Sequence, residues 1–196
     1  MKKVCLMIAA VLIGMSAMAQ VHFGAKVGFD MTHFWGENVT HRMTPNYQVG
    51  ALMEYKFNNT IGISPEVVFA AQGGAAKEGA YEATFHTNYI NVPVMLKIYA
   101  TPDLSIDLGP QVGFNVYSKI TEKGSLSGGG IDISAKETTD LKDETNTVDF
   151  GVGLGATYNL TENAFVQARY TMGLTKVFDG GEAKNGNIQV AFGWKF

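Results

Sequence analysis

The stretch VDFGVGLGATYNL, residues 148–160, alternates apolar side chains with small or polar ones without a break. Its apolar side is made of Val148, Phe150, Val152, Leu154, Ala156, Tyr158 and Leu160. Its other side is made of Asp149, Gly151, Gly153, Gly155, Thr157 and Asn159. Side chains of a β-strand point alternately to opposite faces. The pattern therefore predicts a strand with one apolar face and one face of small or polar residues.

The same alternation recurs along the chain and predicts an all-β protein of eight strands. The expected strands are 21–34, 46–57, 61–72, 85–100, 104–118, 147–160, 164–177 and 187–196. Their connections are short turns at 58–60, 101–103 and 161–163, and longer segments at 35–45, 73–84, 119–146 and 178–186. Short turns at one end of the strands and long loops at the other are typical of outer-membrane barrels. We therefore expect an eight-stranded antiparallel up-and-down transmembrane β-barrel with both termini at the short-turn end.

The first residues predict a signal peptide. Two lysines precede the apolar run Val4–Ile13, and Ala17–Ala19 supplies a small-residue cleavage pattern. The apolar run is too short to cross a bilayer as a helix, which needs ~20 residues. We expect a signal peptide at 1–19 and a β-barrel domain at 20–196. Its cleavage would remove the chain's one cysteine, and with it any disulfide framework.

The charge of the chain argues against one class of partner. The formal net charge of the full sequence is −3, and loss of the two N-terminal lysines would make the mature chain more acidic. A chain with this net negative charge offers no basic surface to bind the phosphates of nucleic acid. We expect no nucleic-acid partner.

The alternation alone does not say whether the apolar face points outward. A soluble exported barrel of the lipocalin type would put that face inward around a ligand, and this remains the first alternative. A glycine-rich polar face suits a narrow, filled lumen better than a solvated surface. Aromatic girdles at the lipid interface are suggested by Tyr47, Tyr55, Phe57, Tyr99, Tyr158 and Trp194. Both features favour a barrel in the lipid of the bacterial outer membrane, with periplasmic termini and external long loops.

The polar face of the predicted barrel carries as many acidic as basic side chains. The inward set is Lys26, Lys56, Lys97, Arg169 and Lys195 against Asp30, Glu54, Glu66, Asp107 and Asp149. Eight strands enclose a lumen just wide enough for side chains, and an unpaired charge there costs several kcal/mol. We expect a core of ion pairs with Arg169 as its hub, so that Arg169→Met costs about 3–5 kcal/mol. The alternative is that these charges relay protons or line a pore.

Three prolines fall inside the expected strands. Pro65, Pro93 and Pro110 each lack the N–H group that a strand donates to its neighbour. Because a closed barrel has no free edge, we expect these residues at bulges or at strand ends.

Four segments resemble the PorT-type outer-membrane β-barrel family. They are NYINVPVMLKIY (88–99), GPQVGF (109–114), DFGVGLGA (149–156) and FGAKVGFD (23–30). In the last segment Asp30 stands where the family pattern suggests Asn or Ser. The resemblance implies an eight-stranded barrel in the outer membrane. The founding members are linked to protein secretion, so envelope or secretion-system proteins are the implied partners, although fold does not carry function.

Histidines near the first long connection raise the question of a metal site. His33, Glu37 and His41 stand four residues apart, and we expect His86 at the same end of the barrel. On a helix this spacing would align zinc ligands, but Gly36 and its neighbours predict a loop. We expect ordinary polar loop residues, with no metal and no other cofactor.

Serines at the long-loop end are the candidates for a lipid-modifying barrel enzyme, which is the second alternative. They are Ser118, Ser125, Ser127 and Ser134. A serine nucleophile needs a base within hydrogen-bond reach, and no histidine has a suggestive spacing from any of them. The glycine triplet 128–130 lacks the lysine of a phosphate-binding loop. We expect no catalytic residue.

The longest connection, 119–146, carries more acidic than basic residues. It is either a contact surface, because loops on a rigid scaffold carry recognition, or a solvated tip. The residues around 128–130 alternate, which predicts a hairpin beyond the membrane. Together these observations predict a small, monomeric, non-enzymatic outer-membrane barrel that acts through its external loops or as a partner of envelope proteins.

Overall fold

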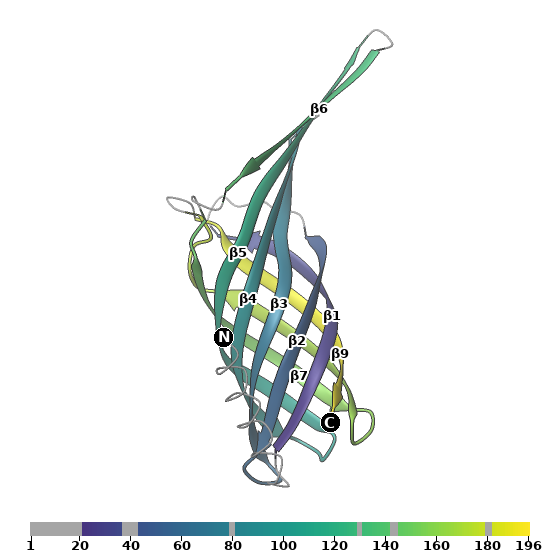
Figure 1. The fold of residues 1–196 in the computed structure, drawn as a ribbon, viewed down its shortest axis with the longest axis vertical. Coiled ribbons are helices and arrows are strands. Elements are labelled where there is room, and N and C mark those ends of the chain that lie inside the picture. The colour runs from purple at the N-terminus through teal and green to yellow at the C-terminus, as the bar shows by residue number, and fades with distance from the viewer. Residues whose placement is uncertain (1–20, 37–42, 79–80, 129–130, 142–144, 179–181) are drawn as a thin grey trace, which may run out of the picture.

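The computed structural model describes residues 21–36, 43–78, 81–128, 131–141, 145–178 and 182–196 (Figure 1). The strands are β1 (Val21–Trp35), β2 (Thr44–Lys56), β3 (Ile61–Glu78), β4 (Tyr81–Tyr99), β5 (Leu104–Gly128), β6 (Ile131–Asp140), β7 (Val148–Asn159), β8 (Ala164–Gly173) and β9 (Lys184–Lys195). Within these ranges, no helix has the length and apolar character needed to cross a membrane. The expected signal peptide, 1–19, lies outside the described residues.

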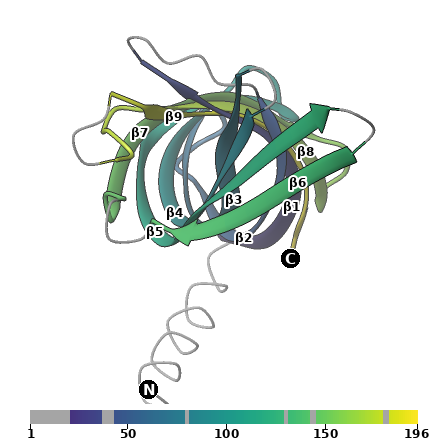
Figure 2. The same cartoon turned by 90° about the horizontal axis from the view of Figure 1, so that it is seen from above.

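Eight of the strands close into a barrel. Their order around the ring is β4-β3-β2-β1-β9-β8-β7-β5, and β4 pairs with β5 to complete it (Figure 2). Each neighbouring pair is antiparallel. The last strand, β9, lies between β1 and β8, so the first and last strands of the chain pair directly. The predicted eight-stranded antiparallel barrel is confirmed.

The two ends of the barrel differ as the sequence predicts. The turns after β2, β4 and β7 lie together at one end, called the short-turn end here. In the first of these turns the N–H of Phe57 donates to the carbonyl of Ile61 at 2.9 Å, and in the last the N–H of Leu160 donates to the carbonyl of Ala164 at 2.8 Å. β1 begins and β9 ends at the same end (Figure 1). The opposite end is called the long-loop end.

Side chains alternate between the outside of the barrel and its lumen. On β1, Val27 and Phe29 are 59% and 55% exposed, whereas Lys26 and Asp30 are buried. The apolar face therefore points outward, as a barrel in lipid requires. The aromatic residues that lie exposed near strand ends, as expected, are Tyr47, Phe57, Tyr158 and Trp194.

Tyr99 does not belong to this outer set. It is only 7% exposed, and it lies two residues after Lys97, whose side chain is buried in the lumen. Residues i and i+2 of a strand share a face, so the ring of Tyr99 also points inward. The prediction that Tyr99 faces lipid was wrong. A position near a strand end does not decide the face of a side chain, whereas the alternation along the strand does.

The prolines lie inside strands, so the expectation of bulges or strand ends was wrong. The pairs are Pro65↔Val94, Pro93↔Gln111 and Pro110↔Val152. Beside the first proline, the β3–β4 ladder loses pairs and resumes at Val68↔Asn91 in the same register. The register shift of the β4–β5 ladder lies elsewhere, between Asn88 and Tyr89. Pairs on either side hold the register, so a missing donor does not need a bulge.

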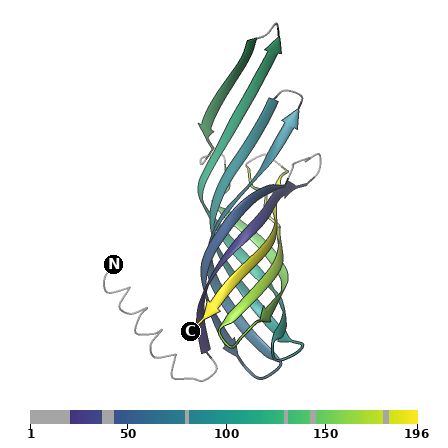
Figure 3. The ribbon, with the colours of Figure 1, turned by 90° about the vertical axis from the view of Figure 1, so that its right-hand side faces the viewer.

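β3, β4 and β5 continue beyond the barrel at the long-loop end and, with β6, form a four-stranded sheet (Figure 3). This extension is called the protruding sheet. β5 pairs with β6 up to Gly128↔Ile131, which confirms the predicted hairpin. β3 pairs with β4 up to Glu78↔Tyr81, so most of 73–84, expected as a loop, is strand. Outside lipid a sheet needs no apolar face, and residues 73–84 lack the alternation that identifies the other strands.

Gly73 lies where β3 leaves the barrel wall. The pairing of β3 with β2 ends at Ala70. Gly73 has a φ of +150°, a conformation that side chains disfavour, and a Cβ there would collide with the carbonyl of Phe85. Its own carbonyl accepts hydrogen bonds from Thr32 Oγ1 at 2.8 Å and Thr44 Oγ1 at 3.2 Å. At the base of the protruding sheet, hydrogen bonds from side chains of β1 and β2 therefore replace the backbone pairing that β3 has lost.

Deleting residues 187–196 should leave no folded barrel. The deletion removes most of the pairing that β9 makes with β1 and β8, and each backbone group left unpaired in lipid costs several kcal/mol. Heat-modifiable gel migration of the truncated chain in the membrane fraction measures this. Normal insertion and migration of the truncated chain would show that β9 is not needed for closure.

Candidate functional site

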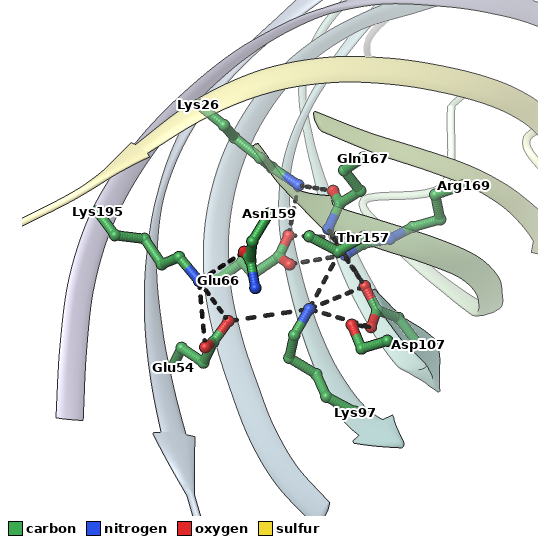
Figure 4. Close-up of polar contacts among 11 residues, drawn as sticks. Lys26, Glu54, Glu66, Lys97, Asp107, Thr157, Asn159, Gln167, Arg169 and Lys195 are labelled. Carbon is green, nitrogen blue, oxygen red and sulfur yellow. Dashed lines mark hydrogen bonds and ion pairs between the residues drawn. The ribbon is translucent and has the colours of Figure 1, made fainter. Parts of the chain in front are cut away.

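Charged side chains from the inner faces of the strands meet inside the lumen (Figure 4). Those that are buried are Lys26, Asp30, Glu54, Glu66, Lys97, Asp107, Arg169 and Lys195, all of which the sequence places on the inward face. The other two predicted inward charges, Lys56 and Asp149, are half-buried. The alternation of the sequence therefore identifies the charged lining correctly.

Glu66 on β3 is the carboxylate that binds two cations at once. Its Oε2 lies 2.6 Å from Lys26 Nζ. The guanidinium of Arg169 binds the same carboxylate with both ends, through Nη2 to Oε1 at 2.7 Å and Nη1 to Oε2 at 3.0 Å. A two-point contact of this kind is the strongest geometry for an ion pair. Glu66, rather than Arg169, therefore connects β1, β3 and β8.

Asp107 on β5 organises a second cluster. Lys97 Nζ lies 3.0 Å from both carboxylate oxygens, and the hydroxyls of Ser105 and Thr157 donate to the same carboxylate at 2.7 Å and 2.5 Å. Thr157 in turn accepts from Lys97 at 3.1 Å. Several donors thus satisfy one buried carboxylate, which is what a buried charge needs to be tolerated.

Glu54 and Gln167 link these clusters to the rest of the lumen. Lys195 Nζ lies 3.3 Å from Glu54 Oε1, and Lys97 Nζ lies 4.0 Å from Glu54 Oε2. The side-chain amide of Gln167 accepts from Lys26 at 2.8 Å and donates to Thr157 at 3.1 Å. The whole set, called the lumen network, consists of Lys26, Glu54, Glu66, Lys97, Ser105, Asp107, Thr157, Asn159, Gln167, Arg169 and Lys195 (Figure 4).

The prediction that Arg169 is the hub of the ion pairs was wrong. Arg169 contacts one carboxylate, and Glu66 contacts two cations. Asp30 is buried, and neither of its carboxylate oxygens has a hydrogen-bond partner among the described residues. Asp149 accepts from Asn185 Nδ2 at 2.8 Å and from the hydroxyl of Thr175. Which carboxylate meets which cation depends on how far the strands are shifted along one another around the ring. The alternation in the sequence tells only which side chains point inward.

The glycines on the inner face of β7 make room for the network. A Cβ on Gly155 would collide with the carbonyl oxygen of Ala168 and lie 3.0 Å from the Cα of Arg169, and one on Gly153 would lie 3.4 Å from the Cδ of Arg169. Glycine at 155 therefore lets β8 lie close to β7, and glycine at 153 leaves room for the arginine side chain to extend along the wall and reach Glu66.

An aromatic cluster lies at the long-loop end of the lumen. Phe34 of β1 packs edge-on against Phe85 of β4 and against Phe178, with ring centroids 6.0 Å and 5.9 Å apart. Val177 and Ala183 complete the cluster, and Phe34 is only 2% exposed. Sequence reasoning missed this feature, although Phe34 shares the inward parity of Lys26.

Among the candidate residues that the structure describes, no metal ligands and no pair of nucleophile and base lie together. His33 on β1 and His86 on β4 are separated in the ring by β2 and β3, and Glu37 and His41 lie outside the described residues. In the described part of the chain, no three acidic, histidine or cysteine residues could hold a metal. Ser118 donates to Asn115 Oδ1 at 3.2 Å and is buried, whereas nearby His86 is exposed on the outer face. The side chains of Ser125, Ser127 and Ser134 lie outside the described set.

A closed antiparallel barrel with an apolar outer face and a charged lumen defines the class of small transmembrane β-barrels. The chain belongs to the family of the outer membrane protein beta-barrel domain, whose model matches residues 16–179. The protein is therefore a small barrel of the bacterial outer membrane, and the soluble, ligand-carrying alternative is not favoured. Nothing in these comparisons is specific to the PorT type.

Solved structures share the fold. The crystal structure of Ail, the attachment invasion locus protein of Yersinia pestis, is similar with a TM-score of 0.54 and 16% identity, covering 91% of this chain and 100% of that one. Neisserial surface protein A is similar with a TM-score of 0.50 and 13% identity, covering 89% of this chain and 97% of that one. At such identities the likeness extends to the fold alone. A comparison with curated proteins finds no match.

Glu66→Gln should destabilise the barrel more than Arg169→Met. Loss of the Glu66 charge leaves Lys26 and Arg169 buried without their carboxylate and should cost about 3–5 kcal/mol. After Arg169→Met, Glu66 keeps Lys26 at 2.6 Å, so the cost falls below the range predicted from the sequence. The measurement is the urea midpoint of unfolding in lipid vesicles.

The matched control is Lys176→Met. Lys176 also forms an ion pair, with Glu182, but both side chains are about half exposed, and such pairs contribute ~0–1 kcal/mol. An equal loss of stability in Glu66→Gln and Lys176→Met would contradict the central place given to Glu66.

The barrel should not conduct ions. A cavity among Glu54, Glu66 and Lys97 holds only about 10 Å³, which is about the space of a single water molecule, and the aromatic cluster crosses the long-loop end. Single-channel recording in a planar bilayer should give a flat trace. Steady ohmic conductance would instead favour the pore alternative.

Proposed function

We propose that this protein is a non-enzymatic outer-membrane barrel of the PorT type that recognises a protein partner of the envelope or of a secretion system. In this proposal the barrel is a closed, monomeric membrane anchor, its termini are periplasmic, and the protruding sheet lies outside the cell. The partner adds a strand to the free edge of β6. The open edge of β6 is the observation that carries this proposal.

β6 presents backbone hydrogen-bonding groups along one side. Among the described strands it pairs with β5 alone, in a register that runs from Lys119↔Asp140 to Gly128↔Ile131. An edge strand is a template for pairing with another chain. An extended peptide that joins such an edge gains main-chain hydrogen bonds, and its side chains supply specificity. The exposed side chains at 137–139 leave the approach to this part of the edge open.

The other edge of the protruding sheet is less suited to a partner. It is formed by β3 beyond Ala70, where the pairing with β2 has ended. The carbonyl of Gly73 on this edge already accepts from Thr32 and Thr44. A partner strand would have to displace these hydroxyls, whereas β6 requires no such exchange.

Two of the segments that resemble the PorT type support that part of the proposal. Residues 109–114 lie on β5 and residues 149–156 lie on β7, and the two segments pair directly, with Gly109 opposite Gly153 and Gly113 opposite Asp149. The two matching segments are therefore direct neighbours in the barrel wall. This pairing is compatible with a shared barrel wall.

The non-enzymatic part of the proposal is supported by the placement of the polar groups. The charges of the lumen network bind one another, and Ser118 and His86 face opposite sides of the wall. A nucleophile and its base need to lie within hydrogen-bond reach. The lipid-modifying enzyme therefore finds no support from these residues.

A photo-cross-linker at Thr138 should capture one protein on living cells. Thr138 is exposed on β6, so benzoylphenylalanine at this position lies beside the proposed partner strand. Replacing 124–135 with an Asn-Gly turn joins Lys123 to Lys136, which already oppose each other, and removes the end of the edge. The adduct should disappear in this shortened variant, while heat-modifiable migration shows that its barrel is folded.

The matched position is Asp103, which is exposed in a turn at the short-turn end. Cysteines at the same two positions report orientation: a membrane-impermeant maleimide should label Thr138→Cys on intact cells and Asp103→Cys only after permeabilisation. Labelling of Asp103→Cys on intact cells would reverse the proposed orientation. Correct orientation without any adduct from Thr138 would leave β6 without a partner and defeat the strand-addition proposal.

A further inference from the structure

A pocket opens at the short-turn end of the lumen. Its volume is about 440 Å³, and its lining residues are Lys56, Asn59, Tyr99, Ala100, Thr101 and Pro102. They come from the end of β2, the end of β4 and the turns that follow these two strands. Turns as short as these have few conformations, so the walls of the pocket are fixed by the barrel.

Lys56 brings a positive charge to this pocket without a carboxylate to neutralise it. Among the residues that the structure describes, no acidic oxygen lies within ion-pair distance of its ammonium group. Its Nζ lies 4.6 Å from the centroid of the Tyr99 ring. A ring face attracts a cation but leaves the ammonium's N–H groups free to donate to an anion.

The lumen behind the pocket has an excess of positive charge. Lys56 follows Glu54 by two residues on β2, so it shares the inner face that Lys97 and Lys195 also line. One carboxylate, Glu54, lies between Lys97 and Lys195, at 4.0 Å and 3.3 Å, and Asp107 is occupied by Lys97 and two hydroxyls. Like charges in a medium of low dielectric repel strongly. An anion beside Lys56 would reduce this repulsion, whereas a cation would increase it.

We propose that this pocket binds a small anionic group, a phosphate or a carboxylate, through the ammonium of Lys56. Neutral donors complete the site. The hydroxyl of Thr101 accepts from the N–H of Leu104 at 3.0 Å, so its O–H remains available to donate, and the amide of Asn59 offers N–H groups. The anionic group belongs to a soluble molecule or to a lipid headgroup. The inference rests on the pocket and its charge, and it does not depend on the proposed role of β6.

The test is a titration of the full barrel in non-ionic maltoside micelles, followed by NMR of lysine side chains labelled at Cε. Inorganic phosphate and acetate are added in separate arms at constant ionic strength. Lys56 should show a saturable shift. In Lys56→Gln the Kd for the anion, followed through the shift of the Thr101 amide, should rise by about tenfold or more, because a hydrogen bond to a charged group is lost.

The matched control is Lys119, which also lies over a tyrosine ring, that of Tyr117 at 5.0 Å, but at the long-loop end. Its signal should stay unchanged. A further arm adds short-chain phosphatidylglycerol. Saturation by this lipid at a lower concentration than by phosphate or acetate assigns the anion to a headgroup, and saturation by phosphate or acetate without a response to the lipid assigns it to a soluble molecule. An unchanged Lys56 signal in all arms, or equal shifts of Lys119, would overturn the proposal.

Discussion

A charge inside an eight-stranded barrel must find its counter-charge on a different strand, because the lumen is too narrow for a solvation shell. The lumen network meets this constraint with residues from all eight strands of the ring: Lys26, Glu54, Glu66, Lys97, Asp107, Thr157, Arg169 and Lys195. Glu66 on β3 takes its cations from β1 and β8, and Lys195 on β9 reaches Glu54 on β2, although the two strands of each of these pairs are not neighbours in the ring. These contacts across the lumen need a closed ring, so a partly assembled barrel would hold unpaired buried charges as well as open edges.

This dependence explains features of the wall that would otherwise look unrelated. Gly153 and Gly155 leave space for Arg169 on the neighbouring strand. The carboxylate of Glu66 then lies where two cations reach it, at 2.6 Å and 2.7 Å. A hydrophobic core would need bulky residues at the same positions. A polar core in a narrow barrel instead needs glycines on some inner faces, so that long charged side chains from other strands have room.

The sequence predicts well the features that depend on alternation along a strand. It predicts poorly those that depend on the shift between strands or on the environment outside lipid. Period two gives the strands and the inward charges, since a one-residue error would move every side chain to the other face. It does not give the partner of Arg169, because that partner lies on β3, across the lumen. The β3–β4 part of the protruding sheet was expected as a loop, since a solvated sheet has no reason to alternate. Tyr99 shows that parity should also decide the residues at strand ends.

The lumen network is not neutral by itself, and this connects the core to the ends of the barrel. Its ion pairs join Lys26, Lys97, Arg169 and Lys195 to three carboxylates. The remaining inward carboxylates, Asp30 and Asp149, lie further toward the long-loop end, because β1 ascends to Asp30 and β7 begins near Asp149. Positive charge is thus concentrated toward the short-turn end, where Lys56 adds to it. The short-turn pocket is the place where this excess positive charge meets solvent, which favours an anion there.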